Sequence, residues 1–295
     1  MAKPSIGWIG TGRMGYAMAR RLAEAGADLK VYNRSAEKAE PLRKHGAKIV
    51  SRAEDLAGCD IVFTMLSVGE VVKEQIANLV RGPKAAALVV DCSSISVEAS
   101  AEIRGLLGSA GVDFLAAPVS GNPHVVEAGQ SSFVVSGPRA AFDRVQPLLL
   151  QMGRNATYVG DAELARIAKI CHNVWLGALT QSLAEVTVLA EKAGLTRKSF
   201  LEFLNASALG STYTRVKAPH WVALDFTATF TPPLMRKDMD LGLALARKLD
   251  APMVLASMTR EIIQSQINQG YVTEDFSTLL LLQARAAGLD IKPES

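Results

Sequence analysis

The chain has 295 residues, of which 49% are hydrophobic and 21% charged, a composition that excludes disordered, collagen-like and coiled-coil proteins. Its 32 basic and 29 acidic residues give a formal net charge of +3, and the basic residues are scattered, so no nucleic-acid partner is expected. The three cysteines are too widely spaced for a disulfide framework, and no segment is apolar enough for a transmembrane helix. We therefore expect a cytoplasmic protein of two domains, without a membrane or metal site.

The first part of the chain alternates short β-branched segments with helical patterns, which predicts a parallel sheet covered by crossover helices. Strands are predicted at 5–9, 29–32, 47–50, 61–65, 87–91, 113–116, 132–135 and 157–159. Helices are predicted at 14–25, 36–44, 71–79 and 97–109. Gly26, Gly46 and Gly111 lie where left-handed C-caps are expected. This pattern indicates a doubly wound, Rossmann-type α/β domain.

After about Asp161 the strand patterns give way to apolar residues at every third or fourth position, which predicts an all-α second domain. Residues 164–193 form one long predicted helix of about 45 Å that joins the domains. The predicted domains are therefore 1–162 and 163–295. Because so apolar a helix needs cover on several sides, we expect a homodimer or homotetramer.

A glycine-rich turn lies between the first predicted strand and the helix that follows it, with the sequence Gly10-Thr11-Gly12-Arg13-Met14-Gly15. The first glycine permits a tight turn, the second allows a pyrophosphate to approach the backbone, and the third allows close packing of helix and strand. The helix N-terminus adds N–H groups and a positive dipole. This context predicts a dinucleotide site.

The second predicted strand ends in Asn33-Arg34-Ser35, where an acidic residue would hold the ribose hydroxyls of NAD. No carboxylate is present to repel a 2′-phosphate, Arg34 can pair with one, and Asn33 and Ser35 can donate hydrogen bonds. The sequence therefore favours NADP, with NAD as the alternative.

Four further motifs, together with the glycine loop, resemble the β-hydroxyacid dehydrogenase family, which includes 3-hydroxyisobutyrate dehydrogenase, tartronate semialdehyde reductase and glyoxylate/succinic semialdehyde reductases. They are Asp91-Cys92-Ser93-Ser94, Pro118-Val119-Ser120-Gly121, Lys169-Ile170-Cys171-His172-Asn173 and Lys237-Asp238-Met239. The resemblance covers nearly the whole chain. It implies an NADP(H)-dependent oxidoreductase that interconverts a small β-hydroxyacid and the corresponding aldehyde or keto acid.

Lys169 and Asn173 are four residues apart and share a helix face, with Arg166 and His172 near the same side. The apolar surroundings are expected to desolvate the Lys169 amine and lower its pKa. The resemblance makes Lys169 the general acid and base, and Asn173 a substrate-binding residue.

The resemblance also assigns residues to the substrate carboxylate and to the remaining contacts. The substrate set adds Ser120, Gly121, Asn122, Phe230 and Asp238, and the cofactor set adds Leu66, Ser67, Ser94 and Lys237. We expect four cations at contacts with phosphate or carboxylate, namely Arg34, Arg166, Lys169 and Lys237.

Two positions depart from the family pattern, since Asn122 replaces a glycine and His172 an asparagine of many relatives. Two alternatives are an imine reductase and a non-catalytic cofactor-binding scaffold. Imine reductases usually carry aspartate or tyrosine where Lys169 stands, and a scaffold would be expected to have lost this lysine, so both are disfavoured.

Overall fold

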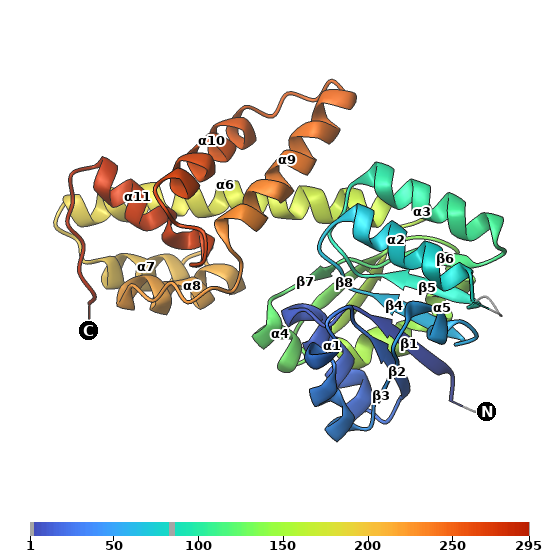
Figure 1. Cartoon of the computed structure of the whole chain (residues 1–295). Coiled ribbons are helices and arrows are strands. Elements are labelled where there is room, and N and C mark those ends of the chain that lie inside the picture. The colour runs from blue at the N-terminus through green and yellow to red at the C-terminus, as the bar shows by residue number, and fades with distance from the viewer. Residues whose placement is uncertain (1–2, 83–85, 295) are drawn as a thin grey trace. The chain divides into compact units, whose positions relative to one another are not determined.

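The computed structural model describes residues 3–82 and 86–294 and contains two compact units, Met1–Ile170 and Cys171–Ser295 (Figure 1). They are called unit 1 and unit 2. Unit 1 holds every strand of the described residues, and unit 2 is built from helices. The sequence predicted this fold class, an α/β domain followed by an all-α domain.

Unit 1 is organised around a six-stranded parallel sheet with the strand order β3-β2-β1-β4-β5-β6. This is the order of doubly wound dinucleotide-binding sheets. The strands follow the predictions closely: β1 Ser5–Ile9, β2 Asp28–Tyr32, β3 Lys48–Ile49, β4 Ile61–Thr64, β5 Leu88–Asp91 and β6 Asp113–Ala116.

Helices cover both faces of this sheet, as Figure 1 shows. One face packs on α1 (Arg13–Glu24), α4 (Pro123–Glu127) and α5 (Arg139–Met152), and the other on α2 (Gly69–Val80) and α3 (Val97–Ser109). The strands alternate accordingly: Trp8 and Phe63 stack on the α1 side with ring centroids 5.5 Å apart, whereas Val62 and Val89 belong to the opposite core. Burial of both faces explains why the strands are apolar throughout.

The prediction of one helix at 36–44 is wrong. Two short 3₁₀ helices, Ala36–Lys38 and Glu40–His45, take its place, and a third 3₁₀ helix occupies Ala53–Leu56. Pro41 provides the physical reason, because proline lacks an N–H group and disfavours helical backbone at the residue before it. The predicted glycine caps are confirmed, with positive φ angles of 77° at Gly26, 92° at Gly46 and 70° at Gly111.

A second, smaller sheet has the order β7-β8-β9 and comprises β7 Val119–Ser120, β8 Ser132–Val135 and β9 Asn155–Tyr158. β8 and β9 lie at predicted strands, but β7 was not predicted. A strand of two residues is too short to show a periodic pattern in the sequence. β7 is held by antiparallel pairing with Phe133 and Ser132 of β8.

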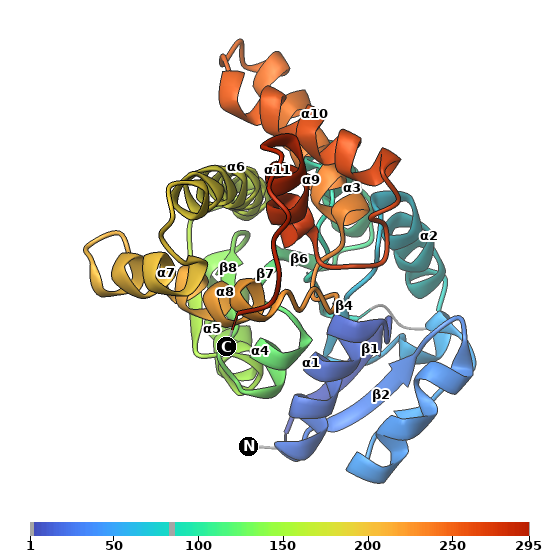
Figure 2. The same cartoon turned by 90° about the vertical axis from the view of Figure 1, so that its left-hand side faces the viewer.

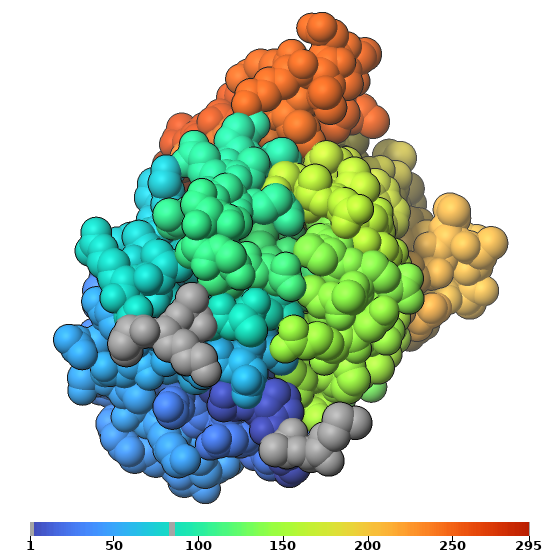
Figure 3. All heavy atoms as spheres, turned by 90° about the vertical axis from the view of Figure 1, so that its right-hand side faces the viewer, coloured from blue at the N-terminus to red at the C-terminus, as the bar shows by residue number. Residues whose placement is uncertain are grey.

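The long helix α6 spans Leu164–Lys192 and confirms the helix predicted at 164–193. Its first two turns belong to unit 1 and the rest to unit 2. Arg104 of α3 secures its beginning, because its Nε donates to Glu163 Oε1 at 2.8 Å and its Nη2 to the Ala162 carbonyl at 2.5 Å. In the space-filling view of Figure 3, the green surface of α3 meets the yellow-green surface of the segment before α6.

A fully buried ion pair connects the first turn of α6 to the sheet. Arg166 is 1% exposed and its Nη2 lies 2.5 Å from Oδ2 of Asp91, the last residue of β5. The same guanidinium donates to the carbonyl of Ser93 at 2.5 Å and to Ser100 Oγ of α3 at 3.2 Å. Arg166 therefore joins α6, α3 and the segment after β5.

Unit 2 packs its helices in pairs, and Figure 2, which looks along α6, shows α7 beside α8 and α9 beside α10. The helices are α7 Arg197–Ala206, α8 Thr212–Ala223, α9 Pro232–Lys248, α10 Val254–Asn268 and α11 Leu279–Ala286. Gly177 of α6 allows a close approach of α9, since a Cβ there would lie 2.9 Å from Met239 Sδ. Among the described helices of both units, none combines the length and apolarity that a membrane span requires.

We predict that Arg166→Met lowers the free energy of unfolding by about 3–5 kcal/mol, because it leaves the Asp91 carboxylate buried without its cation. Urea unfolding followed by circular dichroism measures the loss. Arg20→Met is the control, since the Arg20–Glu24 pair on α1 is exposed, and it is expected to unfold almost like the wild type. Equal stabilities for the two variants would contradict the proposed importance of the buried pair.

Candidate functional site

The glycine loop between β1 and α1 contains two glycines that the fold requires and one that it does not. Gly10 has φ +99°, and a Cβ there would lie 2.4 Å from the Met65 carbonyl oxygen. A Cβ on Gly15 would lie 2.1 Å from the Gly10 oxygen. A Cβ on Gly12, by contrast, would meet no atom of the described residues within 4 Å. The open space at Gly12 therefore fits a ligand that approaches the backbone here.

α1 begins directly at this open space, with Gly12 as its N-cap and no acidic residue in its first turn. Its first N–H groups and its dipole therefore face a place where an anion is favoured. A dinucleotide pyrophosphate fits this loop, and residues 10–15 would hold it.

Asn33 braces the glycine loop against the end of β2. Its Oδ1 accepts from the backbone N–H of Thr11 at 2.8 Å, and its Nδ2 donates to the Ser35 carbonyl at 2.8 Å. These contacts engage the oxygen and one N–H of Asn33, so its second N–H is the group that could donate to a phosphate as predicted. Arg34, between these two residues, is exposed.

A buried polar network at the end of β5, which was not predicted, holds the neighbouring loops. Asp91 Oδ1 accepts from Thr64 Oγ1 and from Ser93 Oγ, each at 2.6 Å. Ser93 Oγ in turn accepts from the backbone N–H of Leu66 at 2.9 Å. The network therefore positions the segments that carry the predicted cofactor residues Leu66, Ser67 and Ser94. Two features of the sequence could have indicated this network, namely a charged residue at the end of an apolar strand and an arginine in an apolar helix.

Arg166 takes part in this network, so its expected contact with a ligand phosphate or carboxylate is wrong. The carboxylate that it binds is Asp91 of the same chain, and its side chain is 1% exposed. Cys92, next to Asp91, is also fully buried, and burial raises the pKa of its thiol far above the ordinary value. Cys92 is therefore a neutral core residue and not a nucleophile.

The segment predicted to bind the substrate carboxylate continues from β7 into α4. Gly121 has φ +143°, and a Cβ there would lie 3.0 Å from Val125 Cγ1. Asn122 is the N-cap of α4, and its Oδ1 accepts from the Val125 N–H at 3.0 Å. The departure from the family's glycine therefore has a structural reason, the capping of α4. Ser120 is half-buried on β7.

Within unit 2, four of the residues singled out by the sequence lie together. Asn173 Nδ2 donates to Asp238 Oδ2 at 2.5 Å, and Lys237 Nζ lies 3.2 Å from Asp238 Oδ1. His172 Nδ1 lies 2.9 Å from Asn173 Oδ1. α9 begins at Pro232, so Lys237 and Asp238 lie on its second turn.

Phe230, also in unit 2, is held by a buried carboxylate that the sequence did not reveal. Asp275 Oδ2 accepts from the N–H and the hydroxyl of Thr229, at 3.2 and 2.5 Å, and from the Phe230 N–H at 3.3 Å. Burial raises the pKa of Asp275, but the adjacent Lys217 ammonium, at 2.6 Å, and the hydroxyls of Ser277 and Thr229 outweigh burial and lower it. The charged Asp275 thus ties the loop of Phe230 to the segment before α11.

Lys169 is half-buried on α6, one helical turn before Asn173, so the two side chains share a helix face as predicted. Unit 1 contains Lys169, the glycine loop and Ser120 to Asn122. Unit 2 contains Asn173, Phe230, Lys237 and Asp238.

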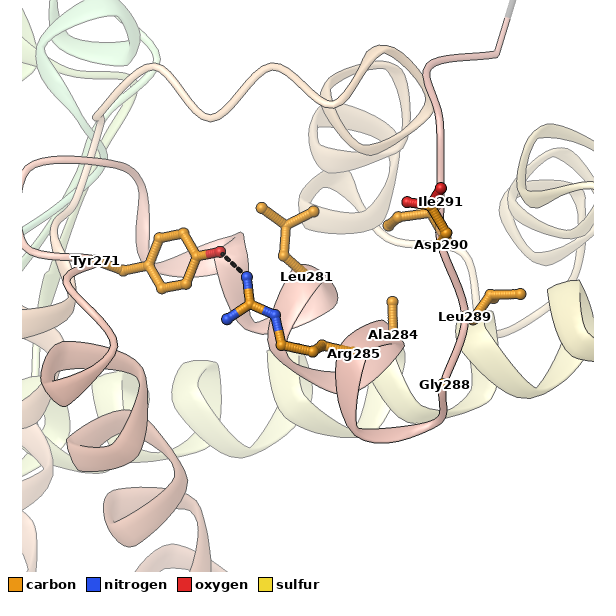
Figure 4. Close-up of a pocket in the computed structure, with 8 residues that line it drawn as sticks. All are labelled: Tyr271, Leu281, Ala284, Arg285, Gly288, Leu289, Asp290 and Ile291. Atoms are coloured by element: carbon orange, nitrogen blue, oxygen red, sulfur yellow. Dashed lines mark hydrogen bonds between the residues drawn. The ribbon is translucent and has the colours of Figure 1, made fainter.

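Unit 2 also has a surface cavity of about 410 Å³, shown in Figure 4. It is lined by Tyr271, Leu281, Ala284, Arg285, Gly288, Leu289, Asp290 and Ile291. Arg285 Nη2 donates to the Tyr271 hydroxyl at 3.2 Å. No residue predicted for the site lines this cavity, and the described part of the chain has no cluster of three potential metal ligands.

We predict that Gly12→Ala folds with nearly wild-type stability but weakens cofactor binding at least about tenfold, because its methyl group enters the space open to a pyrophosphate. Gly15→Ala is expected to destabilise the fold, since its Cβ collides with the Gly10 carbonyl. Thermal unfolding and fluorescence titration with NADPH separate the two effects. Unchanged NADPH affinity in Gly12→Ala would contradict this assignment.

Comparison with protein-family models matches both parts of the chain. Residues 5–160 match the NAD binding domain of 6-phosphogluconate dehydrogenase, and residues 164–283 match the NAD-binding model of NADP-dependent 3-hydroxyisobutyrate dehydrogenase. The first match alone covers more than half of the chain.

Similar proteins agree with these matches over nearly the whole length. Glyoxylate/succinic semialdehyde reductase 2 of Arabidopsis thaliana is 31% identical over 94% of this chain and 78% of its own. 3-Hydroxyisobutyrate dehydrogenase of Pseudomonas aeruginosa is 30% identical over 93% of this chain and 96% of its own. The solved structure of Mycobacterium tuberculosis 3-hydroxyisobutyrate dehydrogenase with L-serine is 28% identical, with a TM-score of 0.87 over 95% of this chain and 99% of that one. This chain therefore belongs to the β-hydroxyacid dehydrogenase family, the NAD(P)-dependent oxidoreductases that act on CH–OH groups.

Proposed function

We propose that the protein is an NADP(H)-dependent oxidoreductase that interconverts a small β-hydroxyacid and the corresponding aldehyde or keto acid, with Lys169 as the proton-transferring residue. The observation that carries the proposal is that Lys169 lies one helical turn before Asn173, whose carboxamide is bound to Asp238 at 2.5 Å, in a chain of this family. An amine and an amide on one helix face offer a proton and a hydrogen bond to neighbouring oxygen atoms of one small substrate.

A nicotinamide cofactor bound at the glycine loop would supply the hydride chemistry. Lys169 gives a proton to the carbonyl oxygen during reduction and removes it from the hydroxyl during oxidation. Asn173 donates a hydrogen bond to the substrate. Asp238 holds this amide in place and is itself paired with Lys237.

The preference for NADP rests on the end of β2. Arg34 is exposed there, and Asn33 and Ser35 on either side of it are joined to each other by a hydrogen bond. This brace favours a defined path for the backbone that carries the guanidinium. Arg34 would pair with the 2′-phosphate, and Leu66, Ser67, Ser94 and Lys237 complete the proposed cofactor contacts.

The proposed substrate is a small carboxylate-bearing molecule. The backbone N–H groups of Gly121 and Asn122 and the hydroxyl group of Ser120 can donate hydrogen bonds to its carboxylate. The named substrates of the two curated relatives are acids of this size. Phe230 provides an apolar wall, held by Asp275.

We assign different roles to the two predicted domains. Residues 1–162 bind the cofactor, and residues 163–295 supply the proton donor, substrate contacts and subunit contacts.

A homodimer or homotetramer is favoured by exposed apolar side chains at the α9–α10 connection and on α10, where Leu249, Val254, Leu255 and Met258 are 60% exposed or more. The three free cysteines favour a reducing compartment such as the cytoplasm.

Replacing Lys169 by alanine is expected to lower kcat by about 10²–10⁴, because the reaction loses its proton donor, while NADPH binding is retained. Oxidation of NADPH is measured with glyoxylate, succinic semialdehyde, tartronate semialdehyde, methylglyoxal and cyclic imines. Lys192→Ala is the control, since Lys192 is an exposed lysine at the other end of the same helix. A full rate in Lys169→Ala would refute the mechanism, and turnover of cyclic imines alone would favour an imine reductase.

Replacing Arg34 by alanine is expected to raise the KM for NADPH by about tenfold or more, because a charge-assisted contact with the 2′-phosphate is lost. The KM for NADH, which lacks this phosphate, is expected to stay the same and serves as the internal control. If both constants remain at wild-type values, Arg34 does not determine cofactor choice.

A further inference from the structure

We infer that His172 is a positioning residue that carries a proton on Nδ1, donates it to the Asn173 carboxamide oxygen, and thereby leaves Asn173 an N–H to offer the substrate. This inference deepens the proposed function and rests on it, because the role of Asn173 toward the substrate is part of that function. All the contacts that carry it lie within unit 2.

Asp238 determines the orientation of the Asn173 amide. Asp238 is 3% exposed, and its Oδ2 lies 2.5 Å from the nitrogen of Asn173, while its Oδ1 faces Lys237 Nζ at 3.2 Å. An ionised carboxylate only accepts hydrogen bonds, so a flipped amide would place two oxygens against each other at this short distance. Asp238 therefore fixes Asn173 with its nitrogen toward α9 and its oxygen toward His172.

This orientation of the amide determines which nitrogen of the His172 imidazole carries a proton. Asn173 Oδ1 lies 2.9 Å from His172 Nδ1, and a carboxamide oxygen can only accept. The ring nitrogen at this position must therefore be the donor, which means the neutral Nδ1–H tautomer or the cation. The Nε2–H tautomer would set two lone pairs against each other.

With these two contacts made, the Asn173 side chain has one hydrogen-bonding group left for a ligand. A carboxamide has two N–H groups, of which one is given to Asp238, and its oxygen is engaged by His172. The remaining polar group is one N–H, a donor. Asn173 is thus suited to an oxygen acceptor, such as the carboxylate or carbonyl oxygen of the proposed substrate, and His172 and Asp238 together keep it in this orientation.

The chain offers a matched pair of variants for a test. In His172→Asn, the side-chain nitrogen replaces Nδ1 as a donor at a similar distance from the backbone. His172→Leu removes the donor and keeps an apolar side chain of comparable reach. His220→Leu is the control, because it removes a partly exposed histidine of unit 2 that faces Asp225 and not Asn173.

The tautomer is tested by nitrogen NMR of the imidazole rings at pH about 8.5, where free imidazole is neutral. The His172 signals, identified by their loss in His172→Asn, are expected to show a protonated Nδ1. In Asn173→Ala this preference should disappear. A proton on Nε2 in the wild type would overturn the inference, and this result does not depend on any enzymatic activity.

Kinetics test the positioning role. His172→Leu is expected to raise the KM for the carbonyl substrate about fivefold to tenfold, the effect of losing one hydrogen bond, with NADPH affinity unchanged. His172→Asn should restore most of the loss, and His172→Leu should add nothing in the Asn173→Ala background. An equal effect in both backgrounds would overturn the inference. A wild-type protein that turns over no carbonyl acid refutes the proposed function instead, while the NMR result still decides the state of His172.

Discussion

The buried ion pair between Arg166 and Asp91 is the constraint on which the arrangement of unit 1 depends. Both side chains are essentially inaccessible to water, so their desolvation has to be offset by a complete set of partners. Thr64 and Ser93 donate to the carboxylate, and Ser93 and Ser100 accept from the guanidinium. These partners come from β4, the segment after β5, and α3. The first turn of α6 is therefore placed against the sheet edge, and the position of Lys169, three residues after Arg166, follows from it.

Two further buried carboxylates organise unit 2 in the same manner. Asp238 holds the Asn173 amide and faces Lys237, and Asp275 joins the loop of Phe230 to the segment before α11 through Lys217, Thr229 and Ser277. A carboxylate suits this task because it accepts several hydrogen bonds at once and has no donor of its own. Asp238 thereby joins helices α6 and α9, and Asp275 holds the loop of Phe230 in place.

The chain's departures from its family lie on the substrate side of the proposed site, and the structure accounts for them locally. Asn122 caps α4 with its side-chain oxygen, and a glycine at this position has no side chain to do so. His172 supplies a donor to Asn173, which an asparagine at the same position also has. The cofactor side is closer to the general pattern, because a loop that lets a pyrophosphate touch the backbone tolerates little variation.

The sequence by itself determined the fold class, most strands, the long helix and the cofactor loop, because periodic apolar residues and glycines act over short distances. It failed at residues 36–44, where Pro41 divides a helical pattern, and at β7, which exists only through its pairing with β8. Tertiary structure alone decided that Arg166 binds Asp91, that Asn33 braces the glycine loop, and that Asp275 supports Phe230. These partners are 75, 22 and 45 residues apart in the chain. The role of a polar side chain depends on which distant partner desolvates and pairs with it, and no local pattern records that choice.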